Sequence, residues 1–370
     1  MLKLPVYLKL FIILFGLIMM FFILIVGKAF LVPVLTAFIF ALILQPVCHF
    51  LEKWKISRGI SAILSMVLIV IILFFTFYFI SIQVSSISKD LTAIGVKFQG
   101  FIDNTNAWLS DNLNIAESEQ SDYLKNSIAD FIQNSSSILT NTLSATADFF
   151  TSLVLILISL FFLLYYRSFF VEFLYQLVNK QNHPKLGHII SRGSSVVRSY
   201  VIGLFIVISI LAVLNTTGLM LIGIEHAMFF GLLAALLTVI PYFGVFIGSI
   251  LPIVFAFLTK DSLWYPVGVA IMFWIVQFLE GNFITPNIVG NKVSLNPFAV
   301  IVGLFVGGMV WGAIGMILAI PTIAMLKVIF DAVEPLQPFG FLLGYPPDVS
   351  KAEKPLQEKK QVVEQEEVNA

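Results

Sequence analysis

The chain has 370 residues, of which 59% are hydrophobic and only 11% are charged. Soluble globular proteins average about 45–50% apolar and about 25% charged residues, so this chain has too few charges to cover a water-soluble body. A soluble enzyme, a nucleic-acid-binding protein and a disordered chain are therefore excluded. The 21 basic and 21 acidic residues balance, so no net charge attracts a partner. The remaining class is an all-α, polytopic integral membrane protein.

Eight apolar runs are long enough to form membrane helices, which need about 20 residues within a range of roughly 17–25. The first run continues into Val26-Gly27-Lys28 without a small-residue cleavage site, so we expect a retained helix rather than a removable signal. We expect residues 1–82 to hold the first three membrane helices. The eight runs cover residues 10–26, 29–47, 60–82, 149–166, 201–223, 227–258, 263–279 and 298–326.

Basic residues predict the orientation of these helices, because cytoplasmic loops carry an excess of Lys and Arg. They gather before the first helix, between the second and third, and after the fourth, which suits a cytoplasmic position for all three regions. The loop after the third helix is acidic and belongs outside. With an even number of crossings, both termini are cytoplasmic. The basic residues concerned are Lys3, Lys9, Lys53, Lys55, Arg58, Arg167, Lys180, Lys185, Arg192 and Arg198.

The one large polar region is the loop of residues 83–147, in which apolar residues recur at spacings of three and four. This pattern predicts an amphipathic helical hairpin that extends the third and fourth membrane helices out of the bilayer. Its apolar seam is narrow, which suits pairing between subunits, and we expect a homo-oligomer; pairing within the hairpin explains the seam equally well. The charged tail, residues 346–370, has few bulky apolar residues, which predicts disorder.

Residues 148–200 are expected to hold the fourth membrane helix and a cytoplasmic amphipathic connector. Within 167–198, Phe and Leu residues share one helical face, and Pro184 interrupts the pattern. The net positive charge favours a helix lying on the inner leaflet. An ordinary packed connector is the alternative interpretation.

No enzyme motif is present, so we predict no catalytic residue, no metal site and no cofactor. The four histidines stand apart in the sequence, and Glu225 and His226 are adjacent, which puts them on different sides of a helix. The single cysteine, Cys48, excludes a disulfide framework within the chain and a cysteine-based metal cage. The expected partners are the lipid bilayer and a small-molecule or ion substrate, with no nucleic acid.

The segment 201–345 is the predicted transporter core, because two of its runs are too long for one crossing. About 30 residues of helix span about 45 Å, whereas the hydrocarbon core is about 30 Å thick. Both runs contain helix breakers, since proline removes a backbone donor and glycine permits bending or close packing. The breakers are Pro241, Gly244, Gly248 and Pro252 in the first run, and Gly307, Gly308, Gly312, Gly315 and Pro321 in the second.

Two interpretations of these runs remain open. They are either long kinked helices packed through small residues, or re-entrant hairpins whose tips expose backbone groups within the membrane, as transporter binding sites do. The second interpretation would move the loop 280–297 from the outer to the inner side.

Between the two runs, Glu280 ends an apolar helix with no cation nearby before Lys292. Ionisable residues at membrane depth are costly and commonly functional, so we predict a substrate or ion site there. A solvated carboxylate at a helix end is the alternative. The candidate ligands are Gln277, Glu280, Asn282, Thr285 and Asn287. Asn215-Thr216-Thr217 in the fifth helix is a second polar patch. Hydrogen bonding between helices explains it at least as well as contact with a substrate.

Three patterns carry a family resemblance. They are Pro241-Tyr-x-Gly244-x-x-x-Gly248-x-x-x-Pro252, Glu280-Gly281-Asn282-x-x-x-Pro286-x-Ile-x-Gly290 through Leu295-x-Pro297, and Gly307-Gly308-x-x-x-Gly312-x-x-Gly315 through Pro321. Together they resemble the autoinducer-2 exporter family, once catalogued as an uncharacterised family of bacterial membrane proteins. Order and spacing agree over roughly residues 225–330, while the rest agrees only in layout. The resemblance implies a secondary carrier of the bacterial inner membrane; members are linked to export of autoinducer-2, and some to sodium/proton antiport.

We therefore predict a secondary transporter in which Glu280 carries a proton or sodium ion and alternating access moves a small solute outward. Glycines would permit close packing or hinge motion, and prolines would break helices. The hinge and break positions are Pro241, Gly244, Gly248, Pro252, Pro286, Gly290, Gly312, Gly315 and Pro321. A passive oligomeric channel, or a membrane scaffold that uses the hairpin of residues 83–147 to bind partners, is the alternative.

Overall fold

The computed structural model describes residues 5–76, 78–79, 81–82, 100, 135–241, 243–289 and 294–345, and of residues 6 and 135–149 it describes only the backbone. Every regular element within these ranges is a helix, and they contain no strand, which confirms the all-α fold. The predicted tail and most of the predicted outer hairpin lie outside the described residues; residues 135–147 of that hairpin form the start of the helix Ser135–Tyr165. The chain divides into two compact units. One comprises Met1–Val171 with Val201–Gly290, and the other comprises Glu172–Tyr200 with Asn291–Ala370.

The first unit contains most of the apolar helices. They are α1 (Val6–Val26), α2 (Lys28–Lys53), the helix Arg58–Thr76, α5 (Ser135–Tyr165), α8 (Ala227–Leu237), α9 (Phe243–Thr259), α10 (Trp264–Leu279) and α11 (Thr285–Ile288). A π-helical turn, Glu280–Ile284, joins α10 to α11. The second unit contains α12 (Pro297–Trp311), α13 (Ala313–Ala332), a 3-10 turn (Glu334–Leu336) and α14 (Gln337–Leu343).

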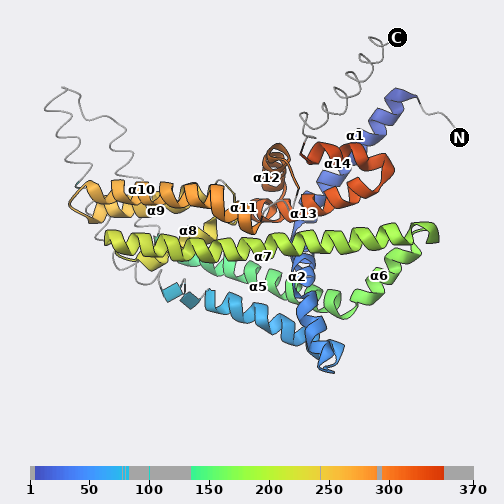
Figure 1. Ribbon diagram of the computed structural model, residues 1–370, viewed down its shortest axis with the longest axis horizontal. Coiled ribbons are helices and arrows are strands. Elements are labelled where there is room, and N and C mark those ends of the chain that lie inside the picture. Colours follow the sequence, from blue (N-terminus) through green and yellow to red (C-terminus); the bar gives the residue numbers. More distant parts are fainter. Residues whose placement is uncertain are drawn as a thin grey trace, which may run out of the picture. The chain divides into compact units, whose positions relative to one another are not determined.

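Two helices contribute residues to both units: α6 (Arg167–Gln176) and α7 (His183–Ile222). A 3-10 turn, Lys180–Asn182, lies between them. Figure 1 shows α7 as one long, unbroken helix. Pro184 lies in its first turn, where a missing N–H is tolerated because no helical acceptor precedes it, so proline starts this helix rather than interrupting it.

The described residues of the eight predicted apolar runs are mostly helical, but the predicted count of eight membrane segments is only approximate. Among the described residues, six helices are long and apolar enough to cross a membrane, or seven if α5 and α6, which are bent by 67°, count as one span. Three apolar helices are shorter: α8, α9 and α12. These shorter helices come from the two runs that contain glycine and proline breakers.

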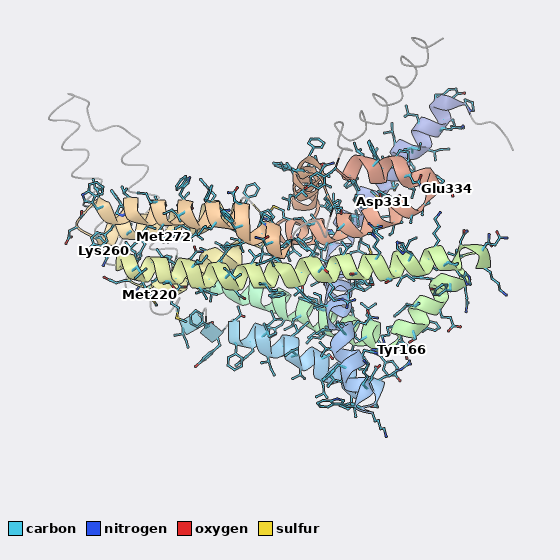
Figure 2. The ribbon with its side chains drawn as sticks, in the orientation of Figure 1. Tyr166, Met220, Lys260, Met272, Asp331 and Glu334 are labelled. Carbon is cyan, nitrogen blue, oxygen red and sulfur yellow. The ribbon has the colours of Figure 1, made fainter. Side chains whose placement is uncertain are left out.

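The apolar run 227–258 is a helical hairpin rather than one long rod. Helices α8 and α9 pack against each other, and a Cβ atom added at Gly248 would lie 2.8 Å from the Cα of Ala234. At the open end, Lys260 Nζ lies 3.2 Å from Glu225 Oε1, which holds the start of α8 beside the end of α9. Figure 2 shows Lys260 at this end of the hairpin.

The run 298–326 is also a helical hairpin. Gly312 breaks it with φ +67° and ψ −145°, a conformation that residues with a Cβ rarely adopt. Helix α12 then packs against α13, and a Cβ at Gly315 would lie within 1.9 Å of the Gly307 carbonyl oxygen. The interpretation of the two runs as long kinked helices is therefore wrong, because the chain reverses after α8, beginning at residues 238–241, and again at Gly312.

Asn296 fixes the open end of the second hairpin. Its Oδ1 accepts a hydrogen bond of 2.7 Å from the backbone N–H of Ala299, which caps α12. Its Nδ2 donates to the carbonyl oxygens of Leu342 and Gly344, each at 2.7 Å. Helix α14 thus lies beside the N-terminus of α12.

The outward faces of the membrane helices are apolar, which suits contact with lipid. Along α1, nearly every described large side chain is exposed, and none of the described residues of its apolar stretch is buried. The core of the first unit instead contains small and branched residues of α2, the helix Arg58–Thr76 and α5, such as Ala37, Leu44, Ala62 and Leu160. This inside-out distribution confirms a polytopic membrane protein, since lipid replaces water as the solvent.

Candidate functional site

Glu280 lies within a helical stretch that is long and apolar enough to cross a membrane. The span Trp264–Ile288 has 25 residues, or about 37 Å of helix, which exceeds the hydrocarbon core of about 30 Å. Glu280 lies about 24 Å along it from Trp264 and about 12 Å from Ile288. Its side chain is only partly exposed. A carboxylate at this depth needs partners, because an isolated charge in a membrane is costly.

A π-helical turn begins at Glu280 and brings Thr285 towards it. In an α-helix five residues turn through about 500°, so Thr285 would point well away from Glu280. A π turn has hydrogen bonds from i to i+5 and places these residues on similar faces. Gly281 and Pro286 explain the turn, because Pro286 has no N–H to offer and its ring would clash with the preceding turn of an α-helix. Such turns occur frequently at functional sites.

Three of the predicted ligands meet at this turn. Gln277 Nε2 donates a hydrogen bond of 2.5 Å to Glu280 Oε2, and the hydroxyl of Thr285 donates a short hydrogen bond to Glu280 Oε1. Each carboxylate oxygen therefore has one protein donor and retains capacity for another. No described Lys or Arg pairs with Glu280. The arrangement can hold a proton on the carboxyl group, or a cation among carboxylate, amide and hydroxyl oxygens.

The other two candidate ligands do not join this cluster. Asn282 Nδ2 donates to the Phe278 carbonyl oxygen at 2.9 Å, and Asn287 Nδ2 donates to the Phe283 carbonyl oxygen at 2.8 Å. Both asparagine side chains are exposed, and each donates its hydrogen bond to a carbonyl oxygen four residues earlier in the chain. Gly290 and Lys292 lie outside the described residues.

The predicted break residues of the first hairpin have two roles. Pro241 lies in the turn between α8 and α9, while Gly244 lies in the first turn of α9, where a Cβ would approach the Leu237 carbonyl oxygen to 1.6 Å. Pro252 is buried inside α9 without ending it. Gly244 and Gly248 therefore permit close contact between helices, as one of the two predicted roles requires.

In the second hairpin, too, one residue forms the turn and others lie where the two helices pack. Gly312 forms the turn, and Gly315 packs against Gly307. Pro321 is buried inside α13 without ending the helix. Pro286 lies in the first turn of α11, directly after the π-helical turn.

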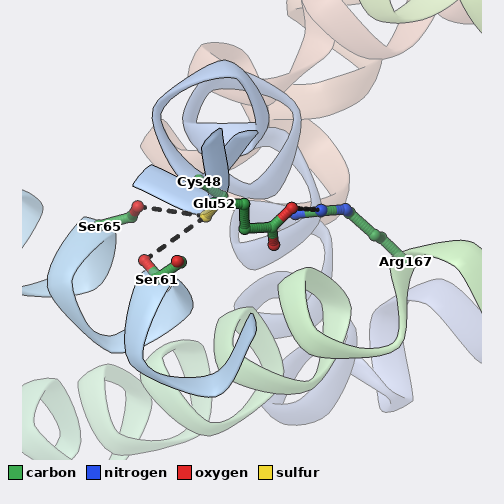
Figure 3. Close-up of polar contacts among 5 residues, drawn as sticks. All are labelled: Cys48, Glu52, Ser61, Ser65 and Arg167. Atoms are coloured by element: carbon green, nitrogen blue, oxygen red, sulfur yellow. Dashed lines mark hydrogen bonds and ion pairs between the residues drawn. The ribbon is translucent and has the colours of Figure 1, made fainter. Parts of the chain in front are cut away.

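A second polar cluster was missed by sequence reasoning (Figure 3). The Arg167 guanidinium, at the bend between α5 and α6, forms a short ion pair with the Glu52 carboxylate at the end of α2. One turn before Glu52, the Cys48 thiol lies 3.1 Å from Ser65 Oγ and 3.7 Å from the Ser61 carbonyl oxygen. The Glu52–Arg167 ion pair joins residues 115 positions apart in the sequence, so no local sequence pattern could have revealed it.

Replacing Arg167 by Ala is expected to destabilise the protein by about 1–3 kcal/mol, because the Glu52 carboxylate would lose its cation while only 17% exposed. Thermal unfolding of the detergent-solubilised protein measures this. Glu52→Ala should cost a similar amount, and the double variant should cost less than the two single changes together. Strictly additive losses would contradict an energetic role for the ion pair.

Asn215 is an unusual buried polar residue in α7. It is 3% exposed, and its Oδ1 makes no hydrogen bond among the described residues. The predicted hydrogen bond between helices is therefore not formed by this oxygen. Gly218, one turn further along α7, packs against Met272 of α10 (labelled in Figure 2), whereas Gly203 packs against Val289. The two helices run antiparallel, and Asn215 is level with the part of α10 that precedes the Glu280 turn.

The described residues contain no group of three or more His, Cys, Asp or Glu side chains that could hold a metal ion. The oxygen atoms around Glu280 are the best candidate set for an ion, and they suit a proton or a weakly held hard cation rather than a transition metal.

Comparison with known proteins points to transport. The family described as "AI-2E family transporter" matches residues 10–334 of this chain. "Putative transport protein YueF" of Bacillus subtilis is 27% identical over 313 residues, which cover 80% of this chain and 82% of that protein. "Putative transport protein YhhT" of Escherichia coli K12 is 24% identical over 328 residues, covering 85% and 87%. "Putative transport protein YrrI" of B. subtilis is 35% identical over 144 residues, covering 37% and 40%.

Proposed function

Since the chain belongs to the AI-2E family of membrane transporters, we propose that it is a secondary carrier that exports a small solute of the autoinducer-2 kind in exchange for protons or sodium ions. The observation that carries this proposal is the Glu280 carboxylate, which lies at membrane depth and accepts hydrogen bonds from Gln277 and Thr285. A carboxyl group can bind and release a proton. The surrounding oxygens can replace part of the hydration shell of a sodium ion.

The first hairpin supports a carrier that opens to the outside. The Glu225–Lys260 ion pair holds both of its ends together, next to the C-terminal end of α7, where Gly268 of α10 faces Ile222. If the N-terminal end of α7 is cytoplasmic, as its basic residues predict, this hairpin enters from the outer side. Its turn then lies within the membrane, where free backbone groups can contact a solute.

The second hairpin supports access from the cytoplasm. Lys185, near the N-terminal start of α7, lies 3.7 Å from Glu334, which follows α13. Asn296, before α12, is bonded to the end of α14, so both ends of the hairpin lie on the side of the basic residues. We accordingly assign Asn296, the end of the loop that leads into α12, and both termini to the cytoplasmic side of a bacterial inner membrane. Self-association through the outer hairpin remains part of the proposal.

Transport by the purified protein in liposomes tests this function. We expect solute flux that saturates with concentration and is driven by an imposed proton or sodium gradient. Flux that never saturates, or unitary electrical currents, would instead identify a channel. Absence of any flux, with loss of the cellular phenotype on deletion of residues 83–147 alone, would identify a scaffold.

Asn215 gives a further prediction on the same path. Replacing Asn215 by Leu should reduce transport several-fold, because we propose that this buried, unpaired amide oxygen contacts the solute or its water when the carrier changes conformation. The same change should leave stability unchanged or raise it by up to about 1–3 kcal/mol, since it removes a buried acceptor without a partner. Flux assays and thermal unfolding measure the two effects.

Thr217→Val is the matched control, because Thr217 is exposed on the same helix and should affect neither quantity. If Asn215→Leu lowered stability and transport in parallel, Asn215 would be a structural residue rather than a solute contact.

A further inference from the structure

The apolar side of α6 is uncovered. None of its residues is buried. Phe169, Phe173 and Leu177 follow at intervals of four, as do Phe170 and Leu174, so these side chains form one continuous arc of the helix. Their exposed fractions range from 40% for Leu174 to 66% for Leu177. Ser168 and Glu172 lie on the other side of the helix, and Gln176 borders the arc beside Phe169, so α6 is amphipathic.

The direction of α6 differs sharply from that of the preceding membrane helix. The axis bends by 67° between Phe150–Tyr165 and Arg167–Gln176. Membrane helices are tilted by about 20° on average from the bilayer normal, so a helix turned by 67° from one of them can run close to the bilayer plane. Tyr165 and Tyr166 lie at the bend and are 39% and 44% exposed; Tyr166 is labelled in Figure 2. Tyrosine is enriched at the boundary between hydrocarbon and water.

Contacts hold both ends of α6 without using its apolar arc. At the N-terminal end, Arg167 pairs with Glu52. Beyond the C-terminal end, a ring nitrogen of His183 lies 3.2 Å from the Val178 carbonyl oxygen, and the His183 ring lies 5.1 Å from that of Tyr175. Tyr175 belongs to the polar side of the helix. The apolar arc is therefore left for something outside the described chain.

The charge of the residues around α6 indicates what covers its apolar arc. Residues 167–192 contain four Lys or Arg residues and one acid, Glu172. Arg167 and Lys185 pair with Glu52 and Glu334, whereas Lys180 and Arg192 are exposed, and no described acid pairs with either. Positive charge beside an apolar helical face favours a membrane surface rich in anionic lipid. A second protein surface would have to be both apolar and acidic.

We infer that α6 lies in the headgroup region of the inner leaflet, with Phe169, Phe173 and Leu177 immersed among acyl chains, and that Lys180 and Arg192 contact anionic lipid phosphates. This inference does not depend on the proposed transport activity. It gives the chain a membrane-surface anchor directly after α5.

Spin labels on the full-length protein test the inference. Cys48 is the only cysteine and is 1% exposed, so the unmutated protein should take up almost no label and serves as the control. Labels at Phe173→Cys and Glu172→Cys report on the apolar arc and on the other side of the helix. In vesicles of phosphatidylcholine with phosphatidylglycerol, we expect the label at 173 to collide several-fold more with oxygen than with a water-soluble nickel chelate. The label at 172 should show the reverse.

A second experiment varies the lipid composition of the vesicles and the charge of the protein at Lys180 and Arg192. Immersion of the label at 173 should decrease in pure phosphatidylcholine, and Lys180→Glu with Arg192→Glu should reduce it only in the anionic vesicles. Strong nickel collisions at both positions would show a helix in water. Exclusion of both reagents at 173, with dipolar broadening between labels, would show packing against a second copy. Either result would overturn the inference, as would immersion that ignores lipid charge.

Discussion

Replacing Glu280 by Gln is expected to reduce ion-coupled flux to that of protein-free vesicles, while the protein still folds and inserts. Glutamine has nearly the same shape but cannot exchange a proton or balance a cation. It can keep hydrogen bonds with Gln277 and Thr285, since an amide both donates and accepts. Solute flux under imposed proton and sodium gradients measures the effect, and thermal unfolding verifies the fold.

The matched control for this change is Glu225→Gln. Glu225 is an acid in the same unit, but it is 65% exposed at the mouth of the first hairpin, so its loss should leave coupling intact. Glu280→Asp keeps the charge on a shorter arm and should retain part of the activity. Coupled flux of wild-type size in Glu280→Gln would remove the carboxylate from the mechanism.

Replacing Gly244 or Gly315 by Ala is expected to prevent correct folding of the corresponding hairpin. A Cβ would lie 1.6 Å from the Leu237 carbonyl oxygen in the first case and 1.9 Å from the Gly307 carbonyl oxygen in the second. Neither obstacle is a movable side chain, so the helices must separate along their length. We expect a loss of more than about 4 kcal/mol, the range reached only by severe core changes. Thermal unfolding and size-exclusion profiles in detergent measure it.

Gly16→Ala, in α1, serves as the control for the glycine substitutions. Nothing lies within 4 Å of a Cβ at that position, and alanine is a better helix former than glycine by roughly 0.5–1 kcal/mol. This variant should be at least as stable as the parent protein. A Gly244→Ala variant with unchanged unfolding temperature would mean that α8 and α9 do not pack as closely as described.

The helices could be predicted from the sequence because apolar length depends on neighbouring residues. The glycines and prolines indicated that both long runs are interrupted, but they left kinked helices and hairpins equally open, and Pro252 and Pro321 do not end their helices. The partners of Glu280 were only partly predictable. Gln277 lies one ordinary helical turn away, whereas Thr285 requires a π turn whose sole sequence signal is Gly281 followed five residues later by Pro286.

Other features depend on contacts between distant segments and have no local signal. The Glu52–Arg167 pair joins α2 to the end of α5 across more than 100 positions. Asn282 and Asn287 looked like ligands by composition, yet each bonds to the carbonyl four residues earlier. That choice is set by the direction of each side chain on its helix, which spacing alone does not give once the helical period changes.

The two ends of the α8–α9 hairpin respond differently to the surrounding medium. At the tip, Gly244 lies against backbone atoms of Leu237, and this contact is insensitive to dissolved ions. At the mouth, the Glu225–Lys260 pair includes a carboxylate that is mostly in solvent, so counterions weaken its attraction as ionic strength rises. A rise in ionic strength should therefore weaken the ion pair at the mouth of this hairpin and leave the packing at its tip unchanged.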